Sequence, residues 1–130
     1  MLIALPVGAC YTGWARRAGM VLYEGTRNRP KLRGAMARSG ALARIALTPE
    51  DMPLADVKEA IRVMLNDGAQ MFSFAMHAPS LSPGHTPYVR TSADLNALYR
   101  WWEEMFSFLD ENNVRPIASD ALIAAAWATR

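Results

Sequence analysis

The two histidines of the chain, His77 and His85, lie eight residues apart. His77 follows the β-prone run at 70–76, and His85 lies in the polar stretch after it. An imidazole changes its protonation near neutral pH, so at a strand end it can exchange a proton with a bound molecule. It can equally be a structural residue with satisfied ring nitrogens. Side chains nearby that could bond a hydroxylated ligand are Ser80, Ser82, Thr86, Tyr88 and Arg90.

Other chemistry has little support in the sequence. A strand-end histidine and a loop histidine without a neighbouring carboxylate make a poor zinc site, so no metal is expected in this chain. The phosphate-binding glycine loop, the Gly-x-Ser-x-Gly elbow and paired cysteines are all missing. Cys10 is the single cysteine, which excludes an intramolecular disulfide, and it has no identified partner that would make it a nucleophile.

Four short runs are predicted as strands. The apolar run at 2–7 favours a buried strand over a lipidation signal, because Pro6 interrupts it and no basic residue precedes Arg16. The run at 70–76 is predicted to carry His77 at its C-terminal end. The remaining strands are expected at 44–47 and 114–118.

Apolar spacings of three and four residues predict helices between these strands. Pro30 opens one that runs to about residue 39, a second covers 54–65 and is closed by Gly68, and Ser92 caps a third. Ser119 is expected to cap a terminal helix at 120–127. Three prolines make 78–91 a long loop. Strands that alternate with helices predict an α/β fold with parallel strands and right-handed crossovers, in one segment at 1–130.

Composition fits an ordinary globular domain of 130 residues, 52% hydrophobic and 20% charged. We expect a cytoplasmic protein, and no run approaches the roughly 20 apolar residues of a spanning helix. Residues 1–44 carry eight Lys/Arg against the single acidic Glu24. That segment could bind an anionic partner, or it could be a solvated face balanced by acidic helices downstream.

The segment from Phe72 through His77 to Arg90 resembles a divergent branch of the polysaccharide deacetylase family, C-terminal part. The strand at 5–7, the turn at 47–50 and the helix after the loop resemble it in the same order. The resemblance implies a partial irregular (β/α) barrel and metal-dependent hydrolysis of N-acetyl groups on carbohydrate, commonly with zinc. It makes His77 the general acid that protonates the leaving amine. It places four further residues at the sugar cleft: Ser80, His85, Tyr88 and Arg90.

The sequence departs from that family in two places. Ala78 follows the histidine where a hydroxyl residue is more usual, and the metal-binding aspartates and His-x-x-x-His pair have no counterpart. A truncated chain, inactive alone, is therefore expected. The alternative is a non-catalytic carbohydrate-binding or self-associating module. The expected partners are carbohydrate and either a second copy or a missing N-terminal half, with neither nucleic acid nor membrane.

Overall fold

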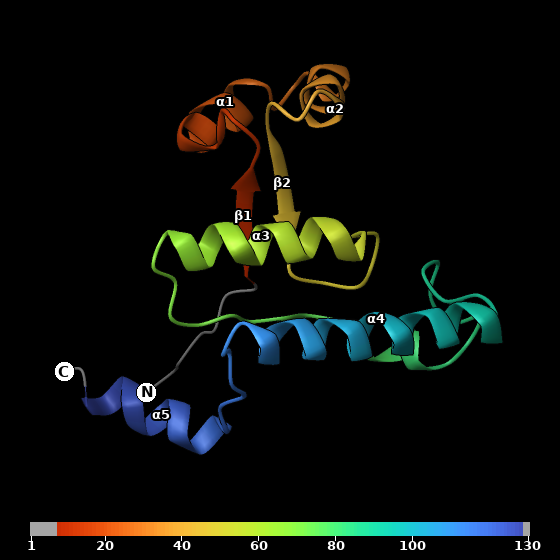
Figure 1. Ribbon diagram of the computed structural model, residues 1–130. Helices are drawn as coiled ribbons and strands as arrows, with labels where there is room; N and C mark the ends of the chain where they lie inside the picture. Colours follow the sequence, from red (N-terminus) through yellow and green to blue (C-terminus); the bar gives the residue numbers. More distant parts are fainter. Residues whose placement is uncertain (1–7, 129–130) are drawn as a thin grey trace.

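The computed structural model describes residues 8–128, which form a mixed α/β fold with five α-helices and one two-stranded sheet (Figure 1). The elements in chain order are β1 (Ala9–Thr12), η1 (Arg16–Ala18), α1 (Gly19–Gly25), α2 (Pro30–Arg38), β2 (Ala43–Ala46), α3 (Leu54–Asn66), η2 (Ala78–Leu81), α4 (Ser92–Glu111) and α5 (Ser119–Ala128). The strand predicted at 2–7 lies outside the described residues.

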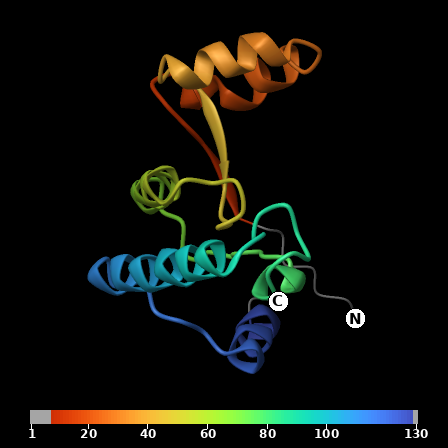
Figure 2. The same ribbon diagram turned by 90° about the vertical axis from the view of Figure 1, so that its right-hand side faces the viewer.

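The sheet is antiparallel, so the prediction of a partial (β/α) barrel with parallel strands is wrong. β1 pairs with β2 in a register that sets Ala9 opposite Ala46 and Thr12 opposite Ala43. The prediction treated every helix between two strands as a crossover on the sheet face. Here α1 and α2 are short and lie at one end of the two-stranded ribbon, so the chain reverses there and returns alongside itself (Figures 1 and 2).

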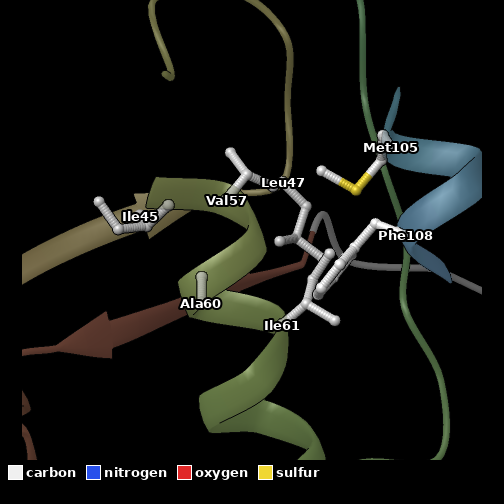
Figure 3. Close-up of a cluster of buried hydrophobic side chains, with 7 residues drawn as sticks. All are labelled: Ile45, Leu47, Val57, Ala60, Ile61, Met105 and Phe108. Carbon is white, nitrogen blue, oxygen red and sulfur yellow. The ribbon is translucent and has the colours of Figure 1, made fainter. Parts of the chain in front are cut away.

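The core lies where α3 packs between the ribbon and α4. Leu47, which follows β2, lies with Ile61 of α3 against Met105 and Phe108 of α4, and Ile45 of β2 lies farther along α3 (Figure 3). The buried cluster consists of Ile45, Leu47, Val57, Ala60, Ile61, Met105 and Phe108. The α3 members recur at spacings of three and four, and the α4 pair is three apart, as expected of one helix face. The periodicity of the sequence therefore predicted both helices correctly.

The stretch at 70–76 is extended, but it is not a strand, contrary to the prediction. It makes isolated backbone hydrogen bonds instead of a ladder: Ser73 accepts from the amide of Gly8 at 2.8 Å, and the amide of Ala75 donates to Leu47 at 3.1 Å. A β-prone composition favours extended backbone, but a strand also needs a continuous partner. These two bonds still fix the stretch beside the end of β2, and thereby fix His77.

The segment 114–118 also lacks the predicted strand. At the end of α4, Asn113 has a φ of 58°, and the amide of Val114 donates to Leu109, a hydrogen-bonded reversal typical of helix C-termini. At its start, α4 is capped by Thr91 and not by Ser92. The Thr91 hydroxyl accepts from the amide of Asp94, whose carboxylate accepts from the amide of Thr91.

In the described part of the chain, no helix combines the length and the apolar character needed to cross a membrane.

Candidate functional site

Glu50 lies in the turn that connects β2 to α3. Thr48 shapes this turn, because its hydroxyl accepts from the amide of Glu50 at 3.2 Å. Asp51 follows with a φ of 58°, a left-handed conformation that turns the chain before α3 begins at Leu54. The result is a carboxylate side chain that is only 6% exposed and points toward the end of the stretch at 70–76. A buried carboxylate requires hydrogen-bond donors, and three surround this one.

His77 supplies two of those donors. Its ring Nδ1 lies 2.5 Å from Oε2 of Glu50, and its backbone amide donates to Oε1 at 3.1 Å. An ionised carboxylate can only accept hydrogen bonds, so the ring proton is on Nδ1. The side chain of His77 is 70% exposed. Glu50 therefore holds the ring from behind and leaves Nε2 directed away from the carboxylate, with no bond to any residue of the described chain.

The third donor is Ser80, in the short helix η2. Its hydroxyl donates to Oε1 of Glu50 at 2.5 Å and lies 3.1 Å from the hydroxyl of Thr86. Thr86 in turn accepts from the amide of Val89 at 3.3 Å. The network thus links the turn after β2 to the loop at 78–91. Ser80 is completely buried, so it supports the pair from beneath.

The electrostatic balance at Glu50 favours the ionised carboxylate. Burial raises the pKa of Glu50, but the hydrogen bonds from Ser80 and from the ring and backbone of His77 outweigh burial, and the pKa of Glu50 is lowered from its ordinary value. A partner that is ionised at neutral pH fixes the Nδ1–H tautomer there. The free Nε2 can then accept a proton, or donate one when the ring is charged.

A surface hollow of about 280 Å³ lies beside the exposed ring. Its lining residues are Thr48, Glu50, Ala75, Met76, His77 and Tyr88. The ring of Tyr88 is inclined by 22° to that of His77, with centroids 6.1 Å apart. Two aromatic rings therefore border the hollow, and one of them carries the free Nε2 of His77. A ligand of about one sugar ring could occupy the hollow.

The predicted site residues separate into two groups. His77 and Tyr88 meet at the hollow, and Ser80 lies directly behind it. His85 bonds only within its own loop, with Nδ1 3.3 Å from the carbonyl of Pro83. Arg90 likewise donates from Nε to the carbonyl of Pro87 and lies outside the hollow. The assignment of Ser80, His85, Tyr88 and Arg90 to a sugar cleft stays a prediction.

The residue without a role in the sequence-based prediction is Glu50. It is separated from His77 by 27 positions, and nothing in the local pattern links the two. One signal was available: the turn that carries Glu50 follows a predicted strand, as His77 does. Side chains after neighbouring strand ends often converge.

The metal that the family resemblance implies does not fit these residues. Over residues 8–128, no group of three or more His, Cys, Asp or Glu side chains could hold a metal ion. Both oxygens of Glu50 are already engaged by His77 and Ser80. The chemistry that this part of the chain can perform is proton transfer at Nε2.

The chain was compared with protein-family models, curated proteins and solved structures, and none of them matches it.

Proposed function

We propose that this chain is the proton-transferring part of a polysaccharide deacetylase-like protein that acts on an N-acetylated carbohydrate. The observation that supports the proposal best is the pair formed by Glu50 and His77, with Nδ1 bound to the carboxylate and the ring exposed at a hollow. An imidazole with a fixed tautomer and a free second nitrogen is suited to general acid–base catalysis. Glu50 is a positioning residue in this arrangement, and His77 is the catalytic one.

In this proposal, the protonated ring of His77 donates its Nε2 proton to the amine that leaves when an N-acetyl group is hydrolysed. Glu50 holds the ring through Nδ1 and leaves Nε2 free for this proton transfer. Tyr88 offers its ring face to the apolar face of the sugar. Activation of the attacking water needs groups beyond these residues, so the chain alone does not complete the reaction. We place the activity in the cytoplasm, because the one cysteine gives no sign of an oxidising compartment.

The test uses a substrate whose leaving group needs no acid. Acetyl transfer from p-nitrophenyl acetate to a free imidazole nitrogen releases p-nitrophenolate, which is followed by absorbance. We expect His77→Ala to reduce this rate to the background rate of the same variant when it is unfolded. His85→Ala should leave the rate of the folded protein unchanged. Equal rates for the two variants would refute a reactive His77. Acetate release from N-acetyl-chito-oligosaccharide is expected to be absent for the chain alone.

A second candidate is a carbohydrate-binding module without catalysis, favoured by the two aromatic rings of His77 and Tyr88 beside the hollow. NMR shifts induced by N-acetyl-chito-oligosaccharide would report binding in either case. Binding that is lost in Tyr88→Ala, combined with no His77-dependent ester cleavage, would favour this module over the proton-transferring role.

A further inference from the structure

The excursion between the two strands, residues 13–42, differs in charge from the rest of the chain. We name it the basic crown. It carries seven Lys/Arg and one acidic residue, Glu24, which leaves seven basic and eleven acidic residues for the remainder. The crown therefore has a net positive charge, while the remainder is net negative. A molecule polarised in this way turns its positive end toward an anionic surface and its negative end away.

Two of the seven basic side chains interact with other residues of the protein. Arg16 forms an ion pair with Asp67 at 2.5 Å, which ties the crown to the end of α3. The guanidinium of Arg33 lies 3.8 Å from the ring centre of Tyr23 and donates to its backbone carbonyl. The other five are exposed and form no ion pair within residues 8–128. These are Arg17, Arg27, Arg29, Lys31 and Arg38.

The crown also exposes large apolar side chains close in sequence to these charges. Trp14 is 82% exposed, Met20 is 70% exposed and Val21 is 76% exposed. All three lie within eight residues of sequence, interleaved with Arg16 and Arg17. Isolated apolar residues on a surface need no explanation, but three together in a basic segment do. An interface that combines positive charge with a tryptophan and aliphatic side chains is what the headgroup region of a bilayer accommodates.

From these observations we propose that the basic crown docks on an anionic lipid surface, with Trp14, Met20 and Val21 entering the boundary between headgroups and acyl chains. The chemistry favours lipid over the other polyanions. Single-stranded nucleic acid needs several aromatic platforms, and an acidic polysaccharide gains nothing from Met20 or Val21. The expectation of no membrane partner was drawn from the lack of a spanning run, which surface docking does not need. The cytoplasmic leaflet of a membrane carries the required negative charge.

Docking in this orientation would leave the Glu50–His77 pair accessible. In both views the crown lies at the top of the molecule, and the segment with η2 lies below α3 (Figures 1 and 2). The inference does not rest on the proposed function, because it uses none of the residues around the hollow.

The test is sedimentation of the whole chain with vesicles of phosphatidylcholine alone or mixed with phosphatidylserine. We expect binding only to the mixed vesicles, and release at high salt. Each exposed arginine near the surface contributes roughly a fivefold factor in affinity, so Arg17→Gln with Arg27→Gln should weaken binding roughly 25-fold. The matched control, Arg100→Gln with Arg115→Gln, removes the same charge outside the crown and should change binding little.

Tryptophan fluorescence tests the insertion itself. With phosphatidylserine vesicles whose acyl chains are brominated, emission should be quenched in the wild type and in Trp127→Phe, but not in Trp14→Phe. If Trp14→Phe fails to fold, Met20→Ser with Val21→Ser replaces it and should lower the affinity. Equal binding to both vesicle types, or none to either, overturns the proposal. Retention on heparin without vesicle binding also overturns it and identifies an acidic polysaccharide as the partner.

Discussion

The carboxylate of Glu50 accepts two hydrogen bonds from His77, one from the ring Nδ1 at 2.5 Å and one from the backbone amide at 3.1 Å. The backbone contact fixes where the residue lies, and the ring contact fixes which nitrogen carries the proton. One buried side chain thus controls both the position and the tautomer of the exposed imidazole.

The tautomer prediction follows from this double contact. In wild type at a pH where the ring is neutral, the ¹⁵N shifts of His77 should report a proton on Nδ1. Glu50→Gln should reduce this preference, because an amide NH₂ turned toward Nδ1 makes that nitrogen an acceptor. His85 provides the internal control and should show the same spectrum in both proteins. An unchanged His77 spectrum in the variant would show that Glu50 does not set the tautomer.

A pH prediction follows from the lowered pKa of Glu50. The unfolded chain takes up a proton on this carboxyl at its ordinary pKa, whereas the folded protein does so only at lower pH. The stabilisation by Glu50 is therefore complete above the ordinary pKa and is lost as the pH falls through the folded value. Urea unfolding at neutral and acidic pH should show a smaller loss for Glu50→Gln than for wild type. Asp94, whose pKa is also lowered, by the Thr91 cap, keeps part of the acid sensitivity in both proteins.

Removal of the Ser80 hydroxyl should destabilise the fold. Ser80→Ala leaves a buried carboxylate oxygen with one donor fewer, and we expect a loss of about 1–3 kcal/mol in the free energy of unfolding. The pKa of Glu50 should rise, because a hydrogen bond to its charged form is lost. Ser82→Ala, in the exposed part of the same loop, should stay within about 0.5 kcal/mol of wild type. Similar losses in both variants would contradict a specific role for Ser80.

The core prediction concerns Leu47, which is completely buried between β2 and the two packed helices. Leu47→Ala should cost about 2–5 kcal/mol of unfolding free energy, through lost burial and the cavity left behind. Leu81→Ala, at an exposed position in η2, is the matched control with the same chemical change. Chemical denaturation measures both. A small effect at Leu47 would mean that the ribbon and α4 do not share a core.

Local signals predicted α3 and α4 well but missed α1 at 19–25, where the pattern of the sequence is irregular. The long-range pairing of the strands was not predicted either. The spacing of Val57, Ile61 and their neighbours reflects one helix face, a property of consecutive residues. The relative direction of two paired strands, in contrast, is not a property of consecutive residues. Whether β1 and β2 pair parallel or antiparallel depends on where the intervening helices lie, and short helices at the ribbon end carry no sequence mark of that placement.

The same contrast between local and long-range signals explains which residues of the candidate site could be predicted. His77 and Tyr88 lie in one stretch of sequence and do meet at the hollow. Glu50 reaches them only through the packing of Leu47 and Ala75, whose backbones bond to each other. Such a contact between separate segments has no local pattern that would predict it.

The pairing of Thr12 with Ala43 has one more implication. Because these two residues are paired where the crown begins and ends, a two-residue hairpin turn could join β1 directly to β2 in place of the crown. The shortened connection would lower the entropic cost of bringing the strands together, and this gain would offset part of the lost packing. The sheet thus has the topology of a β-hairpin whose turn is replaced by the basic crown. The crown and the rest of the protein should be separable by design.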